Sequence, residues 1–137
     1  MNQTVGLVLV SHSAQLAAGL ADLLGQLGVS PGCVAAAGGA EDGGIGTSYE
    51  LIRSGIEAVD QDRGVCILVD LGSALLTTRL VLEDLGGPGQ ARADVVIADA
   101  PFVEGAVAAA VAAAAGSTLA DVVAEAESAY NYRKLAQ

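Results

Sequence analysis

Short apolar segments alternate with helix-like segments along the chain. Four runs carry little internal polarity, as strands covered on both faces of a sheet do. They span residues 5–10, 33–37, 65–69 and 94–98. Between and after them, aliphatic residues recur at three- and four-residue steps, a spacing that predicts helices. The predicted helices span residues 13–27, 51–59, 75–82, about 105–115 and 118–130.

This alternation predicts an α/β fold, a three-layer sandwich with a mainly parallel sheet between two layers of helices. The usual small version has the strand order 2-1-3-4. A chain of 137 residues suits a single domain over its whole length, 1–137. In this strand order the first and third strands are neighbours. Their carboxyl ends therefore meet at one edge of the sheet, where ligands of such folds are expected.

Two residues whose side chains could take part in a reaction follow these neighbouring strands. His12, the one histidine of the chain, comes after the first strand, and Asp70 comes after the third. An imidazole can accept a proton or a phosphoryl group by itself, and a carboxylate that holds one ring nitrogen leaves the lone pair of the other facing outward. Two other interpretations stay open: His12 as a helix-start histidine bonded to backbone, and Asp70 as a residue that caps the following helix or binds backbone amides.

A phosphoryl group on His12 would need hydrogen-bond donors, which helix starts and glycine-rich loops supply. The candidates lie at two helix starts and in the glycine-rich loop 38–48, which follows the second strand and opens on the same edge. They are Ser13, Ala14, Gly46, Thr47, Ser48, Gly72 and Ser73. The loop matches neither common phosphate-binding motif, so nucleotide binding by this chain itself is not expected.

The same loop carries two acidic residues and a helix-start signal. Glu41 and Asp42 are interpreted as solvated charges that point away from the site, with a partner interface as the alternative. Thr47 and Glu50 fit a capping box, which marks the start of the second helix. Serines lie near His12, but no GxSxG motif is present to indicate a hydrolase.

The charge and aromatic content narrow the choice of partners. The formal net charge is −10, with 16 acidic and 6 basic residues, and the basic residues do not cluster. Nucleic acid and anionic membranes are therefore poor partners, whereas a protein with a basic face would be attracted. With one Phe, three Tyr and no Trp, stacking on bases is not expected either. The sequence shows no signal peptide and no bilayer-length apolar run, so a cytoplasmic protein is expected.

Two cysteines and a single histidine do not suggest a metal centre. Cys33 and Cys66 fall in apolar runs without a short CxxC spacing, which predicts buried free thiols rather than a disulfide. His12 has no companion residues at ligand spacing, so no metal site is predicted.

Three segments resemble a known family. They read VGLVLVSHSAQLAAGL, AAGGAEDGGIGTS and VCILVDLGSALLTTRLVLEDL. The combination of SHS, GGxxDGxIGTS and DLGSAL at these separations resembles the phosphotransferase subunits of dihydroxyacetone kinases that depend on the phosphotransferase system (PTS). The IIA domain of these subunits is similar to the mannose-type sugar IIA domains. The resemblance runs from Val5 to about Tyr130.

The resemblance implies a role for the chain and for two of its residues. His12 would accept a phosphoryl group from the phosphohistidine of the carrier protein HPr and pass it to ADP on the nucleotide subunit of the kinase. A third subunit, which carries dihydroxyacetone, would then receive the group. Asp70 would hydrogen-bond His12. The resemblance also implies a homodimer and no cofactor bound by this chain itself.

Two other functions remain as alternatives. A IIA component of a mannose-family sugar system would donate to a IIB domain instead, but such domains resemble DTWGGSP where this chain has DLGSAL, from Asp70 onward. That difference favours the dihydroxyacetone kinases. A regulatory module that binds an anionic ligand at the same edge without turnover is the third possibility.

Overall fold

The computed structural model describes residues 3–87 and 92–135. Its sheet has four strands, all paired in parallel, in the order β2-β1-β3-β4. The strands are β1 (Gly6–Ser11), β2 (Val34–Gly38), β3 (Val65–Val69) and β4 (Val95–Ile97). The predicted α/β class and strand order are therefore confirmed. The expectation of one domain over 1–137 includes positions outside the described residues and stays a prediction.

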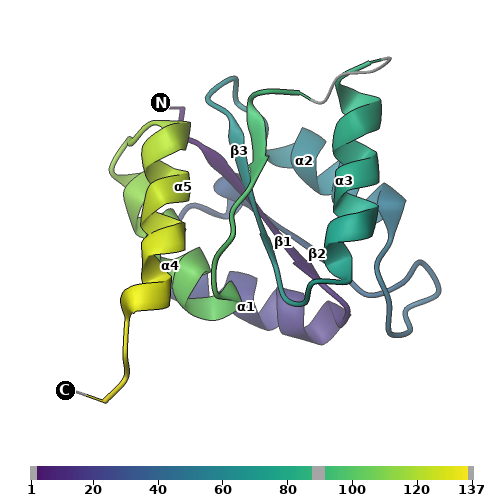
Figure 1. The fold of residues 1–137 in the computed structure, drawn as a ribbon, viewed down its shortest axis with the longest axis horizontal. Coiled ribbons are helices and arrows are strands. Elements are labelled where there is room, and N and C mark those ends of the chain that lie inside the picture. The colour runs from purple at the N-terminus through teal and green to yellow at the C-terminus, as the bar shows by residue number, and fades with distance from the viewer. Residues whose placement is uncertain (1–2, 88–91, 136–137) are drawn as a thin grey trace.

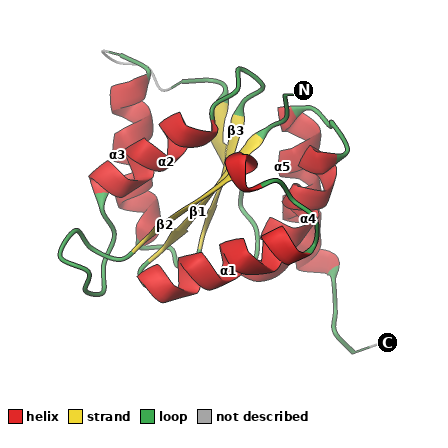
Figure 2. Ribbon diagram, turned by 180° about the vertical axis from the view of Figure 1, so that it is seen from behind, coloured by secondary structure: helices red, strands yellow, loops and turns green. Residues whose placement is uncertain are grey.

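Five α-helices in the described residues cover the two faces of the sheet (Figures 1 and 2). They are α1 (Ala14–Gln26), α2 (Tyr49–Val59), α3 (Ala74–Leu85), α4 (Phe102–Ala114) and α5 (Leu119–Ser128). Helices α1, α4 and α5 lie on one face, and α2 and α3 lie on the other. This arrangement is the predicted three-layer sandwich.

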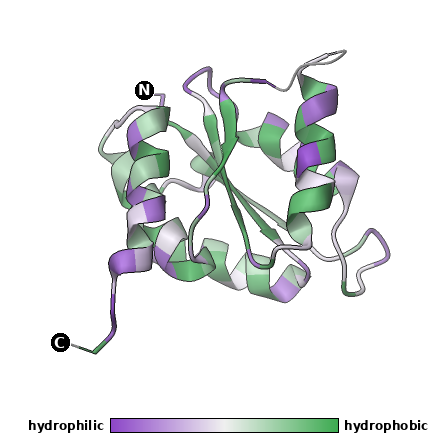
Figure 3. Ribbon diagram, in the orientation of Figure 1, coloured by the Kyte–Doolittle hydropathy of each residue, from purple (hydrophilic) through white to green (hydrophobic). Residues whose placement is uncertain are grey.

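Alternate residues of β1 enter opposite cores. Leu7 and Leu9 pack with α1, α4 and α5, whereas Val8 and Val10 pack with α2 and α3. All six residues of β1 are buried, and the strands are the most apolar part of the ribbon in Figure 3. Continuous apolar runs thus indicated central strands correctly, because helices cover both faces. None of the helices in residues 3–87 and 92–135 is both long and apolar enough to cross a membrane.

Some element boundaries differ from the predicted ones. Strand β2 begins at Val34 because Pro31–Cys33 forms a single 3₁₀ turn. The cap of α2 is Ser48, whose Oγ accepts from Leu51 N, so the expected capping box at Thr47 is wrong by one position. Both cysteines are free, as predicted; Cys66 is buried, and Cys33 is half-buried.

Candidate functional site

The pairing of β1 with β3 brings His12 and Asp70 together. Val10 pairs with Val69 in the parallel register, so the next residues of both strands leave the sheet at the same edge. His12 Nδ1 lies 2.9 Å from Asp70 Oδ1. The sequence positions are 58 apart, and the register of two parallel strands places them in contact.

Three hydrogen-bond donors surround the Asp70 carboxylate. Its Oδ2 accepts from the backbone amide of His12 at 3.0 Å and from the Ser11 hydroxyl at 2.9 Å, while Oδ1 faces the ring of His12. Burial of the carboxyl group acts to raise the pKa of Asp70, but the hydrogen bonds from His12 and Ser11 outweigh it. The pKa of Asp70 consequently lies below its ordinary value, and the group is ionised at neutral pH.

An ionised carboxylate only accepts hydrogen bonds, which fixes the roles of the two ring nitrogens. The proton of neutral His12 lies on Nδ1, and Nε2 carries the lone pair. Nε2 is 2.8 Å from Ser73 Oγ, so the Ser73 hydroxyl donates to it. The side chain of His12 is 20% exposed and that of Asp70 is 9% exposed. The ring that carries Nε2 is therefore the more exposed member of the pair.

Ser73 differs from the other hydroxyl residues that begin helices. Ser13, Ser48 and Thr118 each accept a backbone amide of their own helix through the side-chain oxygen. Ser73 occupies the same position before α3 but makes no side-chain cap. Its hydroxyl bonds to His12 instead. A helix-capping hydroxyl is ordinarily stabilising, so the contact with His12 takes the place of a favourable cap.

Several of the other predicted phosphoryl donors already have partners. The amide of Ser13 donates to Ser11 Oγ, and the amide of Gly46 donates to the His12 carbonyl oxygen at 3.0 Å. The Ser48 hydroxyl is nearly buried and donates to Glu41. These groups hold the loop and helices in place rather than presenting free donors beside Nε2.

The remaining predicted donors take up different positions around the edge. Thr47 Oγ1 lies 2.8 Å from Thr77 Oγ1, a contact that joins the glycine-rich loop to α3. Ala14 is the first residue of α1, where the amide has no acceptor within the helix. Gly72 is exposed in the turn before α3. Among the predicted donors, Ser73 is thus the one bonded to Nε2.

The glycine-rich loop lies close against the start of α1. A Cβ atom on Gly38 would lie 2.5 Å from the Ser13 carbonyl oxygen, so the approach leaves no space for a side chain. Asp42 is exposed and accepts from the Gly44 amide within the loop, which matches its interpretation as a solvated charge. Glu41 is also exposed, although its carboxylate accepts a hydrogen bond from the Ser48 hydroxyl.

Sequence reasoning missed the part played by Ser11. This residue is fully buried at the end of β1, and its hydroxyl bonds to Asp70. A polar residue closing an apolar strand directly before a candidate nucleophile was the available signal. The signal is weak, because a serine at a strand end is common in turns.

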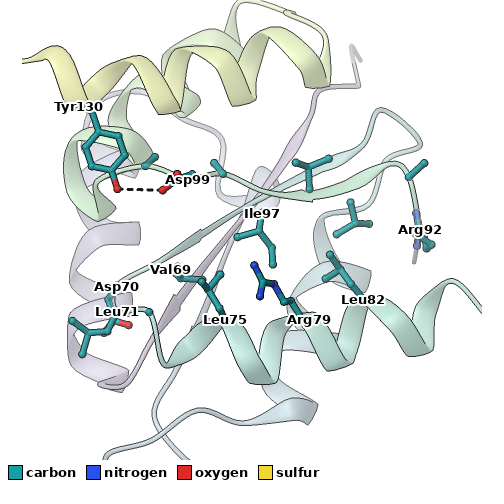
Figure 4. A pocket seen from close by; sticks show the side chains of 16 residues that line it. Val69, Asp70, Leu71, Leu75, Arg79, Leu82, Arg92, Ile97, Asp99 and Tyr130 are labelled. Atoms are coloured by element: carbon teal, nitrogen blue, oxygen red, sulfur yellow. Dashed lines mark hydrogen bonds between the residues drawn. The ribbon is translucent and has the colours of Figure 1, made fainter. Parts of the chain in front are cut away.

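A cavity of about 740 Å³ adjoins the site without including His12 (Figure 4). It lies between α3 and β4, and Asp70 and Leu71 line its end nearest the site. The guanidinium of Arg79 points into it, and the Tyr130 hydroxyl donates to Asp99 on the opposite wall. Asp70 thus both lines this cavity and contacts His12.

Comparisons with curated proteins match the resemblance seen in the sequence. The chain matches the family described as PTS system fructose IIA component over residues 6–123. It is 39% identical to the phosphoryl donor subunit DhaM of the PEP-dependent dihydroxyacetone kinase of Klebsiella michiganensis and 38% identical to that of Escherichia coli, over 96% and 87% of this chain. The chain spans only 28% and 25% of the length of those two relatives.

A shorter relative aligns over most of both chains. It is the phosphotransferase subunit DhaM of the PTS-dependent dihydroxyacetone kinase of Lactococcus lactis. The identity is 35%, and the alignment covers 84% of this chain and 87% of that protein.

Solved structures share the fold. The crystal structure of EF1359, a protein of unknown function, has a TM-score of 0.78 and 32% identity, covering 92% of this chain and 95% of that one. A sigma-54 interaction domain protein from Enterococcus faecalis has a TM-score of 0.65 at 17% identity, over 96% of this chain and 93% of that one, and supports the fold alone. The match over residues 6–123 and the likeness to the DhaM subunits show that this chain belongs to the PTS system fructose IIA component family.

Proposed function

We propose that this chain carries a phosphoryl group on His12 Nε2 as the phosphoryl donor subunit of a dihydroxyacetone kinase. The group would come from the phosphohistidine of HPr and pass to ADP on the nucleotide subunit, for phosphorylation of dihydroxyacetone. The names of the DhaM relatives support this acceptor. The observation that carries the proposal is the 2.9 Å contact between His12 Nδ1 and Asp70 Oδ1, which leaves Nε2 as the nucleophile.

The transfer needs no additional base. The lone pair of Nε2 attacks phosphorus while the N–P bond of the donor phosphohistidine breaks and its electron pair returns to the donor ring. His12 keeps its proton on Nδ1 and becomes a cation, which the ionised Asp70 stabilises. An oxygen of the ADP β-phosphate then attacks phosphorus, the N–P bond to His12 breaks, and ATP and neutral His12 result.

Little more than positioning is required for such a step, because phosphoryl transfer depends mainly on in-line geometry and donors to the phosphoryl oxygens. The Ser73 hydroxyl, which donates to Nε2 in the resting protein, would turn to a phosphoryl oxygen once Nε2 is occupied. The amides of Ala14 and Gly72 are further candidate donors. The chain itself would hold no cofactor, since ADP belongs to the partner subunit.

Exposed apolar side chains next to the site support its contact with partner proteins. Ile45 is 80% exposed beside Gly46, whose amide bonds to the His12 carbonyl oxygen. Leu71 follows Asp70 and is 58% exposed, and Leu76 lies in the first turn of α3 and is 75% exposed. Single exposed apolar residues are ordinary, but a group of them around a reactive residue marks an interaction surface.

The first test is phosphorylation of the protein. With enzyme I, HPr and labelled phosphoenolpyruvate, the wild type should gain an acid-labile phosphate and His12→Ala should gain none. Asp70→Asn should remain folded and be labelled at least about 10-fold more slowly, because an amide at this position can fix the wrong tautomer of the ring and no longer stabilises its cationic form. Equal labelling of wild type and His12→Ala would exclude the phosphohistidine.

The second test identifies the acceptor. Labelled protein should lose its phosphate to an ADP-loaded kinase subunit and keep it with a IIB domain of a mannose-family system. Transfer to the IIB domain alone would assign the sugar-system function. Binding of an anionic ligand without any phosphate on His12 would assign the regulatory one. The homodimer and the cytoplasmic location belong to the same proposal, and light scattering of the purified protein tests the dimer.

A further inference from the structure

The buried hydroxyl of Ser11 has no role in the transfer described above. Ser11 is the last residue of β1 and is 0% exposed. Its Oγ accepts from the Ser13 amide at 3.0 Å and lies 2.9 Å from Asp70 Oδ2. A hydroxyl thus connects the start of α1 to the carboxylate that faces the nucleophile.

The direction of the bond to Asp70 is fixed by the neighbours of Ser11. The Ser13 N–H already occupies a lone pair of Ser11 Oγ, and an ionised carboxylate has no proton to donate. The Ser11 hydroxyl must therefore donate its one hydrogen bond to Asp70 Oδ2. That oxygen also accepts the His12 amide at 3.0 Å, so two donors hold it.

Two donors on one carboxylate oxygen leave the other for the ring. With Oδ2 held by Ser11 and by the His12 backbone, Oδ1 faces Nδ1 at 2.9 Å. Without the hydroxyl, Oδ2 would keep a single donor, and the Ser13 amide would lose its acceptor. The carboxylate would then be freer to rotate, and its hold on the Nδ1 proton would weaken.

We propose that Ser11 is a positioning residue that, through Asp70, keeps the proton of His12 on Nδ1 and so keeps Nε2 nucleophilic. The inference rests on the proposed function, because it concerns the preparation of the same nitrogen for phosphoryl transfer. Ser11 touches neither the reacting nitrogen nor the phosphoryl group; it acts on the orientation of Asp70.

The tautomer of His12 can be measured without any partner protein. Because the chain has one histidine, a ¹⁵N spectrum of the dephosphorylated protein contains a single pair of ring nitrogens. At a pH where His12 is neutral, the wild type should show the proton on Nδ1. In Ser11→Ala the fraction with the proton on Nε2 should rise several-fold. Thr118→Ala removes a hydroxyl cap from α5 and should leave the wild-type spectrum unchanged.

A double-mutant cycle tests whether Ser11 acts through Asp70. Ser11→Ala should slow labelling by phospho-HPr about 10-fold, as the loss of a hydrogen bond to a charged group would give. In the Asp70→Asn background the same change should have little further effect, because the group it orients has already been replaced. The thiol of Ser11→Cys is close in size to the hydroxyl but is a weaker donor. The labelling rate of this variant should therefore lie between those of wild type and Ser11→Ala.

Each result bears on the inference separately from the proposed function. A lower melting temperature for Ser11→Ala, with the wild-type tautomer and labelling rate, would show a purely structural role and overturn it. An equal loss of rate in both backgrounds would do the same. If Ser11→Ala does not fold, a wild-type tautomer in Ser11→Cys overturns it, and an increase in the Nε2–H form supports it. A wild type that takes no phosphate, together with a changed tautomer in Ser11→Ala, would refute the proposed function and leave the inference standing.

Discussion

Asp70 is fixed by hydrogen bonds from neighbouring residues and at the same time orients the imidazole of His12. Its carboxylate accepts hydrogen bonds from the backbone amide of His12, the ring of His12 and the hydroxyl of Ser11. Those hydrogen bonds lower its pKa against the opposing effect of burial. The same contacts that keep Asp70 charged therefore also orient the imidazole, so function and acid stability are linked at this residue.

This linkage predicts an acid-dependent stability term. The folded pKa of Asp70 lies below the unfolded value of about 3.9, so the unfolded state binds more protons as the pH falls. The contribution is present above the unfolded pKa and is lost as the pH drops through the folded pKa. The gap in melting temperature between wild type and Asp70→Asn should therefore shrink as the pH falls below about 4.

A control for this measurement is Glu57→Gln, which removes an exposed pair with Arg53. Exposed ion pairs contribute little to stability, so the melting temperature of Glu57→Gln should stay close to that of wild type at every pH. A gap for Asp70→Asn that stays constant down to about pH 2 would contradict the linkage.

Ser73 should affect transfer without affecting stability. Its hydroxyl bonds to Nε2 and does not cap α3, so Ser73→Ala should leave the melting temperature unchanged. Labelling of His12 should slow roughly 10- to 100-fold, because a hydrogen bond to a charged group contributes about 1.5–3 kcal/mol. Thr118→Ala should show the reverse, with about 1 kcal/mol less stability and normal transfer. A loss of stability in Ser73→Ala at normal rates would assign Ser73 to the helix instead.

At the scale of single residues, His12, Asp70 and Ser73 could be predicted to share one edge of the sheet. Their positions after apolar strands and at a helix start were sufficient, because parallel strands end together. The hydrogen-bond partners of Gly46 and Ser48 could not be predicted. A backbone amide or a hydroxyl can be satisfied by loop, helix or ligand, and only the folded loop determines which.

Among the secondary-structure elements, α1 lies in close contact with β2 next to the site. It begins directly after His12 and packs against the end of β2, where Gly38 leaves no space for a Cβ atom. The helix itself was evident from the spacing of its leucines. The close approach was not, since one glycine in a glycine-rich loop looks like any other until the strand and helix pack.

Gly38→Ala should therefore destabilise the protein by about 1–3 kcal/mol, because the added methyl would overlap backbone atoms of Ser13 and Ala14. His12 precedes these residues, so labelling should slow as well. Gly19→Ala is the matched control: it lies in α1 with nothing within 4 Å of the new Cβ and should gain about 1 kcal/mol. Urea unfolding of both variants measures the difference, and a neutral Gly38→Ala would show that the contact relaxes.

For the whole molecule, the acidic charge and the exposed apolar group around His12 describe the surface that the proposed partners would meet. The net charge of −10 favours approach by a basic face, mainly through the rate of association. Ile45, Leu71 and Leu76 provide exposed apolar area on three segments that meet at the site. In the proposed transfer each partner would have to leave afterwards, so weak and transient contacts are expected here.

Ile45→Ser should raise the KM for phospho-HPr roughly 10-fold with little change in kcat, because burial of an aliphatic side chain contributes about 1.5–3 kcal/mol. Val111→Ser is the control, since Val111 is 61% exposed on α4 and belongs to no part of the site. Steady-state labelling of both variants against HPr concentration distinguishes them. An equal KM for the two would place the docking surface elsewhere.

The sequence by itself determined the layers of the fold, the order of strands and the edge at which His12 lies. Buried strands and amphipathic helices leave distinct hydrophobic periods in a chain, and parallel connections allow few topologies. Only the tertiary structure decided which groups meet around the imidazole. The proton position on His12 depends on contacts between residues 58 and 61 positions apart in the chain, and on a Ser11 hydroxyl whose orientation is set by the Ser13 amide. Such contacts depend on register and packing, which no local pattern encodes.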